Sequence, residues 1–144
     1  MDMLVLDASV IVRWYVVEDF RDKALAIRNN YVDGAIRRIS APMLMPFEVI
    51  NAIKYSRRDI SVTTLKSIVE SLAKYGFNLY ELSGEYAHLT IDTALENNIT
   101  IYDACYVALA EYLDTVLYTA DRKLIESLKE EYRGRIKHIK EYAL

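Results

Sequence analysis

The amino-acid sequence predicts an α/β fold with one mainly parallel central sheet of about five strands, flanked by helices. Short apolar runs alternate along the chain with longer segments whose apolar residues recur at helical spacing. Strands that alternate with helices in this way form a parallel sheet that helices cover on both faces. The 144 residues include only two prolines and four glycines, so most of the chain is expected in packed elements.

Each expected element follows from its local sequence. The expected strands are the apolar runs at residues 3–6, 39–42, 78–80, 116–118 and 136–139. The expected helices are residues 8–17, 21–31 and 46–57, a segment capped by Ser61 or Thr63, one that begins at Ser83, one that opens at Asp103, and residues 122–132. In the helix after Ser83, one apolar face carries Ala87, Ile91, Ala94 and Leu95. The helix after Asp103 is apolar on most sides, which predicts burial.

Composition indicates an ordinary globular protein, with 53% hydrophobic and 27% charged residues. A chain of this length can form one domain with a sizeable core, which we expect over residues 1–144. The single cysteine, Cys105, cannot form an internal disulfide, which suits a reducing compartment. The chain shows neither a signal peptide nor an apolar run long enough to span a bilayer. We therefore expect a soluble cytoplasmic protein.

The charge pattern is compatible with a nucleic-acid partner although the formal net charge is −3. Four acids proposed below as metal ligands account for four negative charges, and the rest of the chain then carries +1. Phosphate contacts require a local positive patch rather than a basic protein. The basic residues are bunched at Arg37-Arg38, Lys54, Arg57-Arg58 and Arg122-Lys123. Solvated helix ends, where cations suit the helix dipole, are the alternative explanation for these groups.

Four carboxylates stand where a short apolar strand is expected to give way to a helix. They are Asp7, Glu48, Asp103 and Asp121. In an open α/β sheet, the carboxyl ends of the strands and the following helix N-termini share one edge, where ligands bind. Acids spread over more than a hundred residues of sequence can therefore converge on one site.

Taken one at a time, each acid could simply cap a helix or offset its dipole. Convergence carries a cost that capping does not explain, because two carboxylates about 4 Å apart repel by about 4 kcal/mol at an effective dielectric of about 20. Such a cluster must take up protons or bind a cation. Oxygen ligands without His or Cys favour Mg²⁺ or Mn²⁺ over zinc. The sequence thus predicts a divalent-metal site.

Four segments around these acids resemble a known family. They are Leu6-Asp7-Ala8-Ser9, Glu48-Val49-Ile50-Asn51-Ala52, Tyr102-Asp103-Ala104-Cys105-Tyr106-Val107-Ala108-Leu109-Ala110 and Thr119-Ala120-Asp121-Arg122-Lys123-Leu124. In order and approximate spacing they resemble the PIN-domain ribonucleases, and most closely the VapC-type toxins of prokaryotic toxin–antitoxin pairs. The resemblance covers essentially the whole chain and shows no departure at the four acids. It implies a single PIN-like nuclease domain.

The resemblance and the residue chemistry together imply metal-assisted hydrolysis of RNA phosphodiester bonds. Asp7 and Asp103 would hold a Mg²⁺ or Mn²⁺ ion most directly. Glu48 and Asp121 would bind through water or complete a second metal position. The sequence leaves open whether one ion or two are bound.

The resemblance also implies supporting residues and partners. Ser9, Asn51 and Thr119 would assist the acids, although helix capping is the first interpretation of Ser9 and Thr119. The family implies a homodimer that is inhibited by a small VapB-like antitoxin. An arginine from such a partner could pair with the clustered carboxylates and compete with the metal.

Rival functions are weaker. A haloacid-dehalogenase-like phosphatase needs a second Asp where this chain has Ser9, and a phosphoacceptor receiver domain needs an early pair of adjacent acids. A non-catalytic PIN-like scaffold that binds RNA or protein is the serious alternative, because fold does not imply function. Loss of an acid would indicate such a scaffold, whereas all four are present. His88 and His138 offer no evident general base.

Overall fold

The strands form one parallel sheet in the computed structural model, which describes residues 2–144. The strand order is β3-β2-β1-β4-β5, and every neighbouring pair is parallel. The strands are β1 (Met3–Leu6), β2 (Arg38–Pro42), β3 (Asn78–Tyr80), β4 (Leu117–Thr119) and β5 (Ile136–His138). The prediction of an α/β fold with a parallel sheet of about five strands is confirmed.

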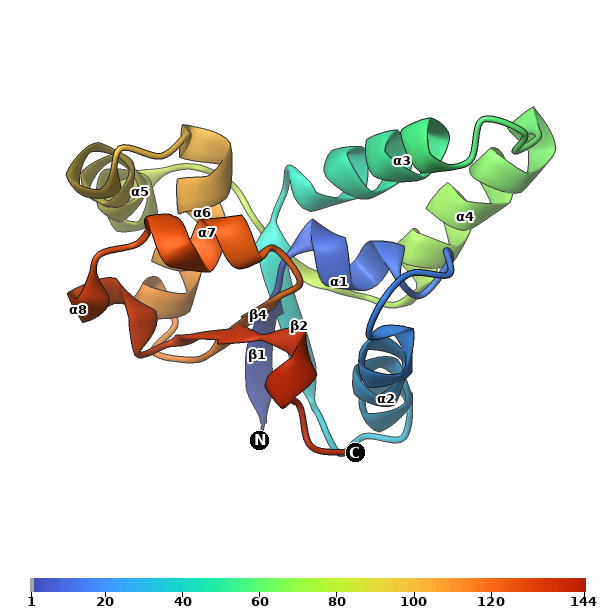
Figure 1. The fold of residues 1–144 in the computed structure, drawn as a ribbon, viewed down its shortest axis with the longest axis horizontal. Coiled ribbons are helices and arrows are strands. Elements are labelled where there is room, and N and C mark those ends of the chain that lie inside the picture. The colour runs from blue at the N-terminus through green and yellow to red at the C-terminus, as the bar shows by residue number, and fades with distance from the viewer. Residues whose placement is uncertain (1) are drawn as a thin grey trace.

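Helices lie on both sides of the central strands, α1 to α4 on one side and α5 to α8 on the other (Figure 1). They are α1 (Ala8–Val12), α2 (Arg21–Val32), α3 (Met45–Ser56), α4 (Val62–Lys74), α5 (Gly84–Asn97), α6 (Ile101–Tyr112), α7 (Arg122–Ser127) and α8 (Glu130–Arg133), followed by a 3₁₀ turn at Ile139–Glu141. None of the helices within residues 2–144 has the length and apolar character that a membrane crossing requires.

The centre of the sheet is also the point where its strand order reverses. β1 pairs with β2 on one side and with β4 on the other, with Leu6 opposite Tyr118. In open α/β sheets, ligands bind beyond the carboxyl ends of strands at such a switch point. Asp7 follows β1 directly, and Asp121 lies two residues after Thr119, the last residue of β4. The topology therefore brings two distant acids to one edge.

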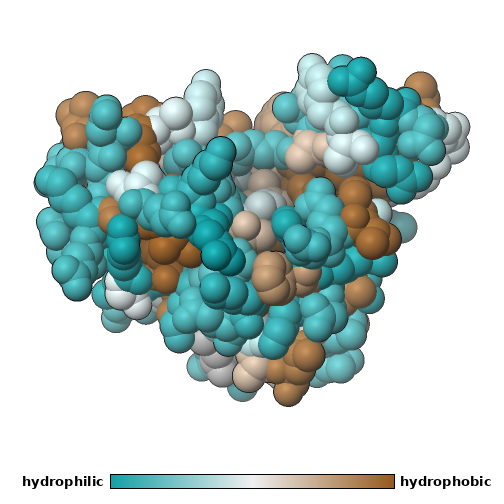
Figure 2. Space-filling model, viewed as in Figure 1, coloured by the Kyte–Doolittle hydropathy of each residue, from teal (hydrophilic) through white to brown (hydrophobic). Residues whose placement is uncertain are grey.

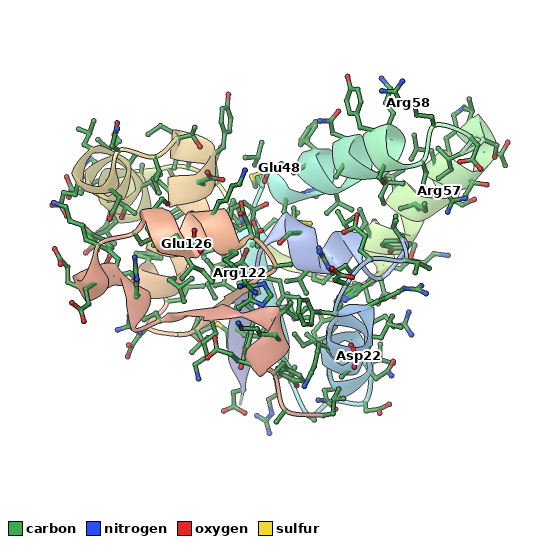
Figure 3. All side chains as sticks on the ribbon, viewed as in Figure 1. Asp22, Glu48, Arg57, Arg58, Arg122 and Glu126 are labelled. Carbon is green, nitrogen blue, oxygen red and sulfur yellow. The ribbon has the colours of Figure 1, made fainter. Side chains whose placement is uncertain are left out.

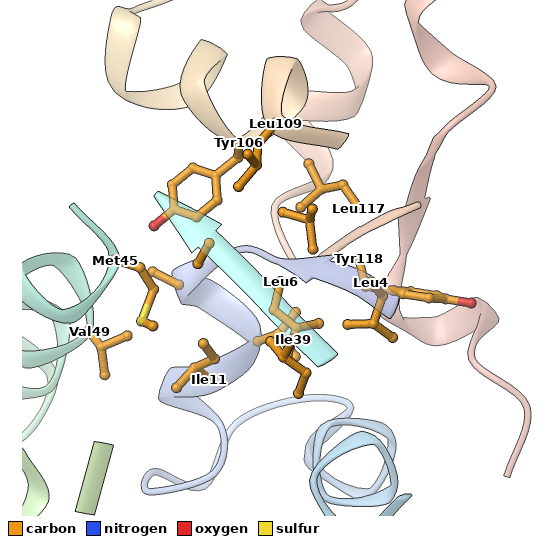
Figure 4. Close-up of a cluster of buried hydrophobic side chains, with 14 of the residues drawn as sticks. Leu4, Leu6, Ile11, Ile39, Met45, Val49, Tyr106, Leu109, Leu117 and Tyr118 are labelled. Carbon is orange, nitrogen blue, oxygen red and sulfur yellow. The ribbon is translucent and has the colours of Figure 1, made fainter. Parts of the chain in front are cut away.

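The core holds this edge in place. Ala104 to Ala110 of α6 are all buried, which confirms the burial expected for that helix. Tyr106 and Leu109 of α6 pack near the buried strand residues Leu6 and Leu117, while α1 and α3 supply side chains on the other side (Figure 4). Because protein interiors are close-packed, elements fixed in this way hold their side chains at defined positions.

The first helix ends earlier than predicted, at Val12. The N–H groups of Trp14 and Tyr15 each donate to the carbonyl three residues earlier, which tightens the chain into a turn. The Arg21 side chain donates to the Arg13 carbonyl at 2.9 Å and to the Trp14 carbonyl at 3.4 Å. These carbonyls are thereby satisfied without continuing the helix.

The predicted helix at residues 122–132 is in fact two helices, α7 and α8. The chain is extended at Leu128, with φ −85° and ψ 141°. The Asn97 side chain of α5 accepts from the Lys129 N–H at 2.8 Å, and Arg133 donates to the Leu128 carbonyl at 2.8 Å. A hydrogen bond from α5 and another from Arg133, the last residue of α8, therefore stabilise the break.

Of the apolar face predicted for α5, Ile91 and Leu95 are exposed, at 48% and 77%, whereas Ala94 is buried. The helix instead buries a face that carries Tyr86, Thr90, Thr93, Ala94 and Asn97. The hydroxyls of Thr90 and Thr93 donate to the carbonyls four residues earlier, so burial leaves neither hydroxyl unsatisfied. A polar stripe of this kind can pack against α6.

Candidate functional site

All four predicted acids line one hollow of about 330 Å³ at the carboxyl edge of the sheet. Figure 2 shows a notch in the surface between the α5–α8 side and the α3–α4 side, and Figure 3 places Glu48 beside it. We call this space the acid hollow. Its lining residues are Asp7, Ala8, Ser9, Val12, Glu48, Asn51, Ala52, Asp103 and Asp121.

Asp7 is held by two hydroxyl groups rather than used as a helix cap. It occupies the N-cap position of α1, but its side chain makes no capping hydrogen bond. Its Oδ2 atom accepts from Ser9 Oγ at 2.5 Å and from Thr119 Oγ1 at 2.9 Å. Among residues 2–144, no protein group donates to Oδ1, which leaves that oxygen available to a cation.

Ser9 and Thr119 also join the segments that follow β1 and β4. Ser9 Oγ accepts from the Ala120 N–H at 3.0 Å, and Thr119 Oγ1 accepts from the Asp121 N–H at 3.0 Å. The prediction that these two residues cap helices is wrong, because the N-cap residues of α1 and α7 are Asp7 and Asp121. Each hydroxyl instead orients Asp7 while it satisfies a backbone N–H between β4 and α7. Asp121 does act as a cap, since its Oδ1 accepts from the Leu124 N–H at 3.2 Å.

Glu48 lies in the first turn of α3 and has a partner that the sequence reading missed. The Tyr106 hydroxyl of α6 donates to Glu48 Oε1 at 2.6 Å. Tyr106 is only 1% exposed, so its ring belongs to the core while its hydroxyl reaches the acid hollow. The available signal was a tyrosine on a helix otherwise expected to be buried, because a buried phenol usually needs a hydrogen-bond partner.

Asp103 reaches the hollow from a helix that does not follow a strand, so the predicted strand-to-helix setting is wrong for this acid. A short link, Asn98–Thr100, joins α5 directly to α6. Thr100 is the N-cap of α6, and its Oγ1 accepts from the Asp103 N–H at 3.0 Å. Three residues further along α6 is Tyr106, so one buried helix places both Asp103 and the partner of Glu48.

Three of the acids are coupled electrostatically. Burial raises the pKa of Asp7, an effect that the hydrogen bonds from Ser9 and Thr119 oppose and that repulsion from Asp121 and Asp103 increases. The pKa of Glu48 is raised by burial and then by Asp7 and Asp103. The pKa of Asp103 is raised by burial and then by Asp121. The charged forms are thus unfavourable together, and protons or a cation would relieve the repulsion.

The donor set suits Mg²⁺ or Mn²⁺, because it consists of oxygen atoms. Among the described residues, no three His, Cys, Asp or Glu side chains already form a cage for an ion. Neither histidine lines the hollow: His88 is exposed on α5, and His138 is buried, with its Nδ1 accepting from the Lys140 N–H.

Asp7→Asn should raise the Tm at pH 7 in metal-free buffer, because it removes an unfavourable buried charge. The pKa of Asp7 in the folded protein lies above its ordinary value of 3.8, so the folded state holds this proton more tightly than the unfolded chain. Its contribution to stability is therefore greatest at acid pH and is lost as pH rises through the raised pKa. Thermal unfolding from pH 4 to 8 should show a flatter profile for Asp7→Asn.

The matched control is Asp92→Asn, on the exposed side of α5, which should leave the pH profile unchanged. An Asp7→Asn protein that is less stable than wild type at pH 7, with the wild-type pH dependence, would contradict the electrostatic interpretation.

Comparison with known proteins assigns the family. The PIN domain model matches residues 4–129. Ribonuclease VapC3 of Pyrobaculum aerophilum is 34% identical over 128 residues, which cover 85% of this chain and 92% of that protein. A crystal structure from Pyrobaculum aerophilum superposes with a TM-score of 0.63 at 20% identity, over 96% of this chain and 90% of that one. A toxin–antitoxin complex from Klebsiella pneumoniae gives 0.61 at 16% identity, over 83% and 88%. The chain belongs to the PIN domain family.

Proposed function

We propose that this protein is a Mg²⁺- or Mn²⁺-dependent endoribonuclease, the toxin of a VapBC-type toxin–antitoxin pair, acting in the cytoplasm as one nuclease domain over residues 1–144. The observation that carries the proposal is the convergence of four acids from distant segments in one hollow at the switch point of the sheet. Membership of the PIN domain family and the likeness to Ribonuclease VapC3 support the choice of RNA as substrate.

The acids have distinct roles in this proposal. Asp7, with its free Oδ1, and Asp103 hold the ion, while Glu48 and Asp121 act through water or complete a second position. A bound Mg²⁺ or Mn²⁺ would lower the pKa of water and stabilise negative charge on the phosphate. Raised pKa values alone do not identify catalysis, but they mark carboxylates that gain most from a cation.

The remaining polar residues keep the acids in position. Ser9 and Thr119 restrict rotation of the Asp7 carboxylate through the two bonds to Oδ2. Asn51 lies one turn beyond Glu48 on α3 and lines the hollow, where its amide can orient a water or a phosphate oxygen. Orientation of this kind matters because misplaced groups lose much of the advantage of proximity.

Purified protein should cleave RNA from a panel of folded transcripts only when Mg²⁺ or Mn²⁺ is present. Asp7→Asn and Asp103→Asn should each lower the rate by about a hundredfold or more, since the ion supplies several kcal/mol. Millimolar Mn²⁺ should raise the Tm of wild type more than that of Asp103→Asn, because ligand binding stabilises the folded state. RNA binding without cleavage in any metal would favour the alternative, a non-catalytic scaffold.

Tyr106→Phe should lower the cleavage rate by about ten- to a hundredfold, the usual cost of removing a group that orients a metal-site carboxylate. The change deletes only the hydroxyl that donates to Glu48 Oε1. It should also raise the Mn²⁺ concentration that gives half of the maximal Tm increase.

Tyr86→Phe provides the matched control for Tyr106→Phe. It deletes a second buried hydroxyl, which donates to the Cys105 carbonyl at 2.7 Å and not to an acid. Both variants lose about 1 kcal/mol of stability, but only Tyr106→Phe should affect cleavage and metal response. Equal activity in the two variants would show that the bond to Glu48 is merely structural.

The proposed partners are a second copy of the chain and a small VapB-like antitoxin. The Klebsiella pneumoniae neighbour is a toxin–antitoxin complex, which supports the antitoxin. Exposed Ile91 and Leu95 on α5 supply apolar surface that a second copy could cover.

Light scattering of the purified protein at micromolar concentration should give the mass of a dimer. A small, basic-tailed protein encoded nearby should co-purify and abolish cleavage. A monomer would overturn the dimer, and full activity with the partner bound would overturn the inhibition.

A further inference from the structure

The acid hollow opens into a longer depression along α3. It shares Glu48 and Asn51 with a neighbouring groove of about 730 Å³, in which Lys54 and Tyr102 lie beside an apolar floor formed by Leu44, Pro46, Phe47, Ile50 and Val69. Lys54 in turn lines a third hollow of about 450 Å³ with Tyr55 and the basic pair that follows α3. Consecutive hollows therefore share lining residues from the acids to the turn between α3 and α4.

One face of α3 presents polar and aromatic side chains to this depression. Lys54 and Tyr55 follow Asn51 at +3 and +4, the spacing of a single helix face, and Arg57 and Arg58 follow in the turn after α3 ends at Ser56. All five residues are exposed, and Lys54 Nζ lies 5.3 Å from the centre of the Tyr55 ring. Figure 3 shows Glu48 at one end of α3 and Arg57 and Arg58 at the other. We call Asn51, Lys54, Tyr55, Arg57 and Arg58 the α3 track.

The cations of the α3 track remain available to a ligand. Within residues 2–144, Lys54 and Arg58 form no ion pair. Arg57 pairs only with Asp59, at 3.3 Å, and both side chains are exposed, so the pair adds little stability. Three positive charges thus stand within five residues, beside a site with four carboxylates.

Helix-end electrostatics explains only part of this surface. Cations near the C-terminus of α3 suit its dipole. The dipole does not explain why Tyr55 is 62% exposed on the same face, or why Tyr102, also 62% exposed, stands across the groove on α6. Exposed aromatic rings beside cations are the usual surface on which unpaired bases stack while the backbone phosphates are neutralised.

We propose that the α3 track is the path of the substrate beyond the acid hollow, and that the substrate is single-stranded RNA along it. Lys54 and Arg58 contact phosphates, and Tyr55 stacks on an unpaired base. The inference rests on the proposed nuclease function. It adds that the RNA lies along α3 next to the acid hollow and that the RNA is unpaired there. From Glu48 to Ser56, the last residue of α3, the helix rises about 12 Å, enough for a few nucleotides. Lys54, Tyr55 and Arg58 bind and position the strand without touching the reacting phosphate.

The test compares three exposed sets of substitutions in the full-length protein. Lys54→Ala with Arg58→Ala removes two track charges, and Tyr55→Ala removes the stacking ring. Arg37→Ala with Arg38→Ala removes two charges where β2 begins, at the end of the sheet opposite the acids. Thermal unfolding checks that every variant is folded. The readouts are kcat and KM on a single-stranded oligoribonucleotide, and the salt dependence of binding.

The track double variant should raise KM tenfold or more, with kcat within about threefold of wild type. The plot of log affinity against log salt concentration should become shallower by about 1.4 in slope for this variant. The reason is that each phosphate contact on a single strand contributes about 0.7, and two contacts are removed. Tyr55→Ala should weaken binding roughly five- to 150-fold without changing that slope. A hairpin that pairs the same sequence should bind more weakly than the open strand. The control pair at β2 should leave KM and slope unchanged.

The possible failures are distinguishable. If wild type cleaves RNA but the track variants match the control pair, the track is overturned and the nuclease function stands. If the track variants change only inhibition by the partner protein and not KM, the groove is a protein-docking surface and the proposal is overturned. If wild type neither binds nor cleaves RNA in Mg²⁺ or Mn²⁺, the proposed function fails and the α3 track fails with it.

Discussion

Burial of several carboxylates in one hollow at the carboxyl edge of the sheet is the constraint on which the site depends. Burial raises the pKa of Asp7, Glu48 and Asp103, and repulsion between the acids adds to the rise. Asp7 cannot turn away freely, because Ser9 and Thr119 hold its Oδ2. The same hydroxyls bind the backbone after β4, so the elements that carry Asp7 and Asp121 are fixed together.

The buried helix α6 holds the other half of the site. Its first turn carries Asp103, and its next turn carries Tyr106, which donates to Glu48 on α3. The Tyr106 ring cannot move without disturbing the core, since it is 1% exposed. Burial of α6 therefore does more than stabilise the fold, because it sets the distance between an acid of its own and an acid of α3. Asp7, which lines the same hollow, experiences repulsion from Asp103 and Asp121.

The sequence predicted the parallel sheet and the convergence of the acids because both follow from local patterns and simple topology. Apolar runs mark the strands, and parallel strands must end at one edge. The prediction from sequence failed where a side chain from another segment determines where a helix ends. Arg21 takes the carbonyls that would extend α1, and Asn97 binds the N–H at the break between α7 and α8. Hydrophobic periodicity carries no information about such bonds.

Side-chain hydrogen bonds account for two further differences between the predicted and the observed elements. On α5, Thr90 and Thr93 are buried because their hydroxyls bond within the helix, so a polar stripe took the place of the apolar one. On α6, the sequence suggested a strand before Asp103, yet the chain passes from helix to helix and Thr100 supplies the cap. Asp103 was identified because it is an acid at the start of a helix. Only the structure shows that this helix follows another helix rather than a strand.

A site with four carboxylates faces a difficulty if its substrate is a polyanion, because the hollow repels the phosphates that it must receive. A divalent ion would reverse the sign of the field at the reacting phosphate, but its influence on exposed charges would be screened beyond about 8–10 Å at physiological salt. The neighbouring phosphates would then need cations of their own. Lys54 near the end of α3, and Arg57 and Arg58 in the turn that follows it, line hollows next to the acid hollow and can supply these cations. Local placement of these three charges, rather than the net charge of −3, therefore governs how the protein would accept RNA.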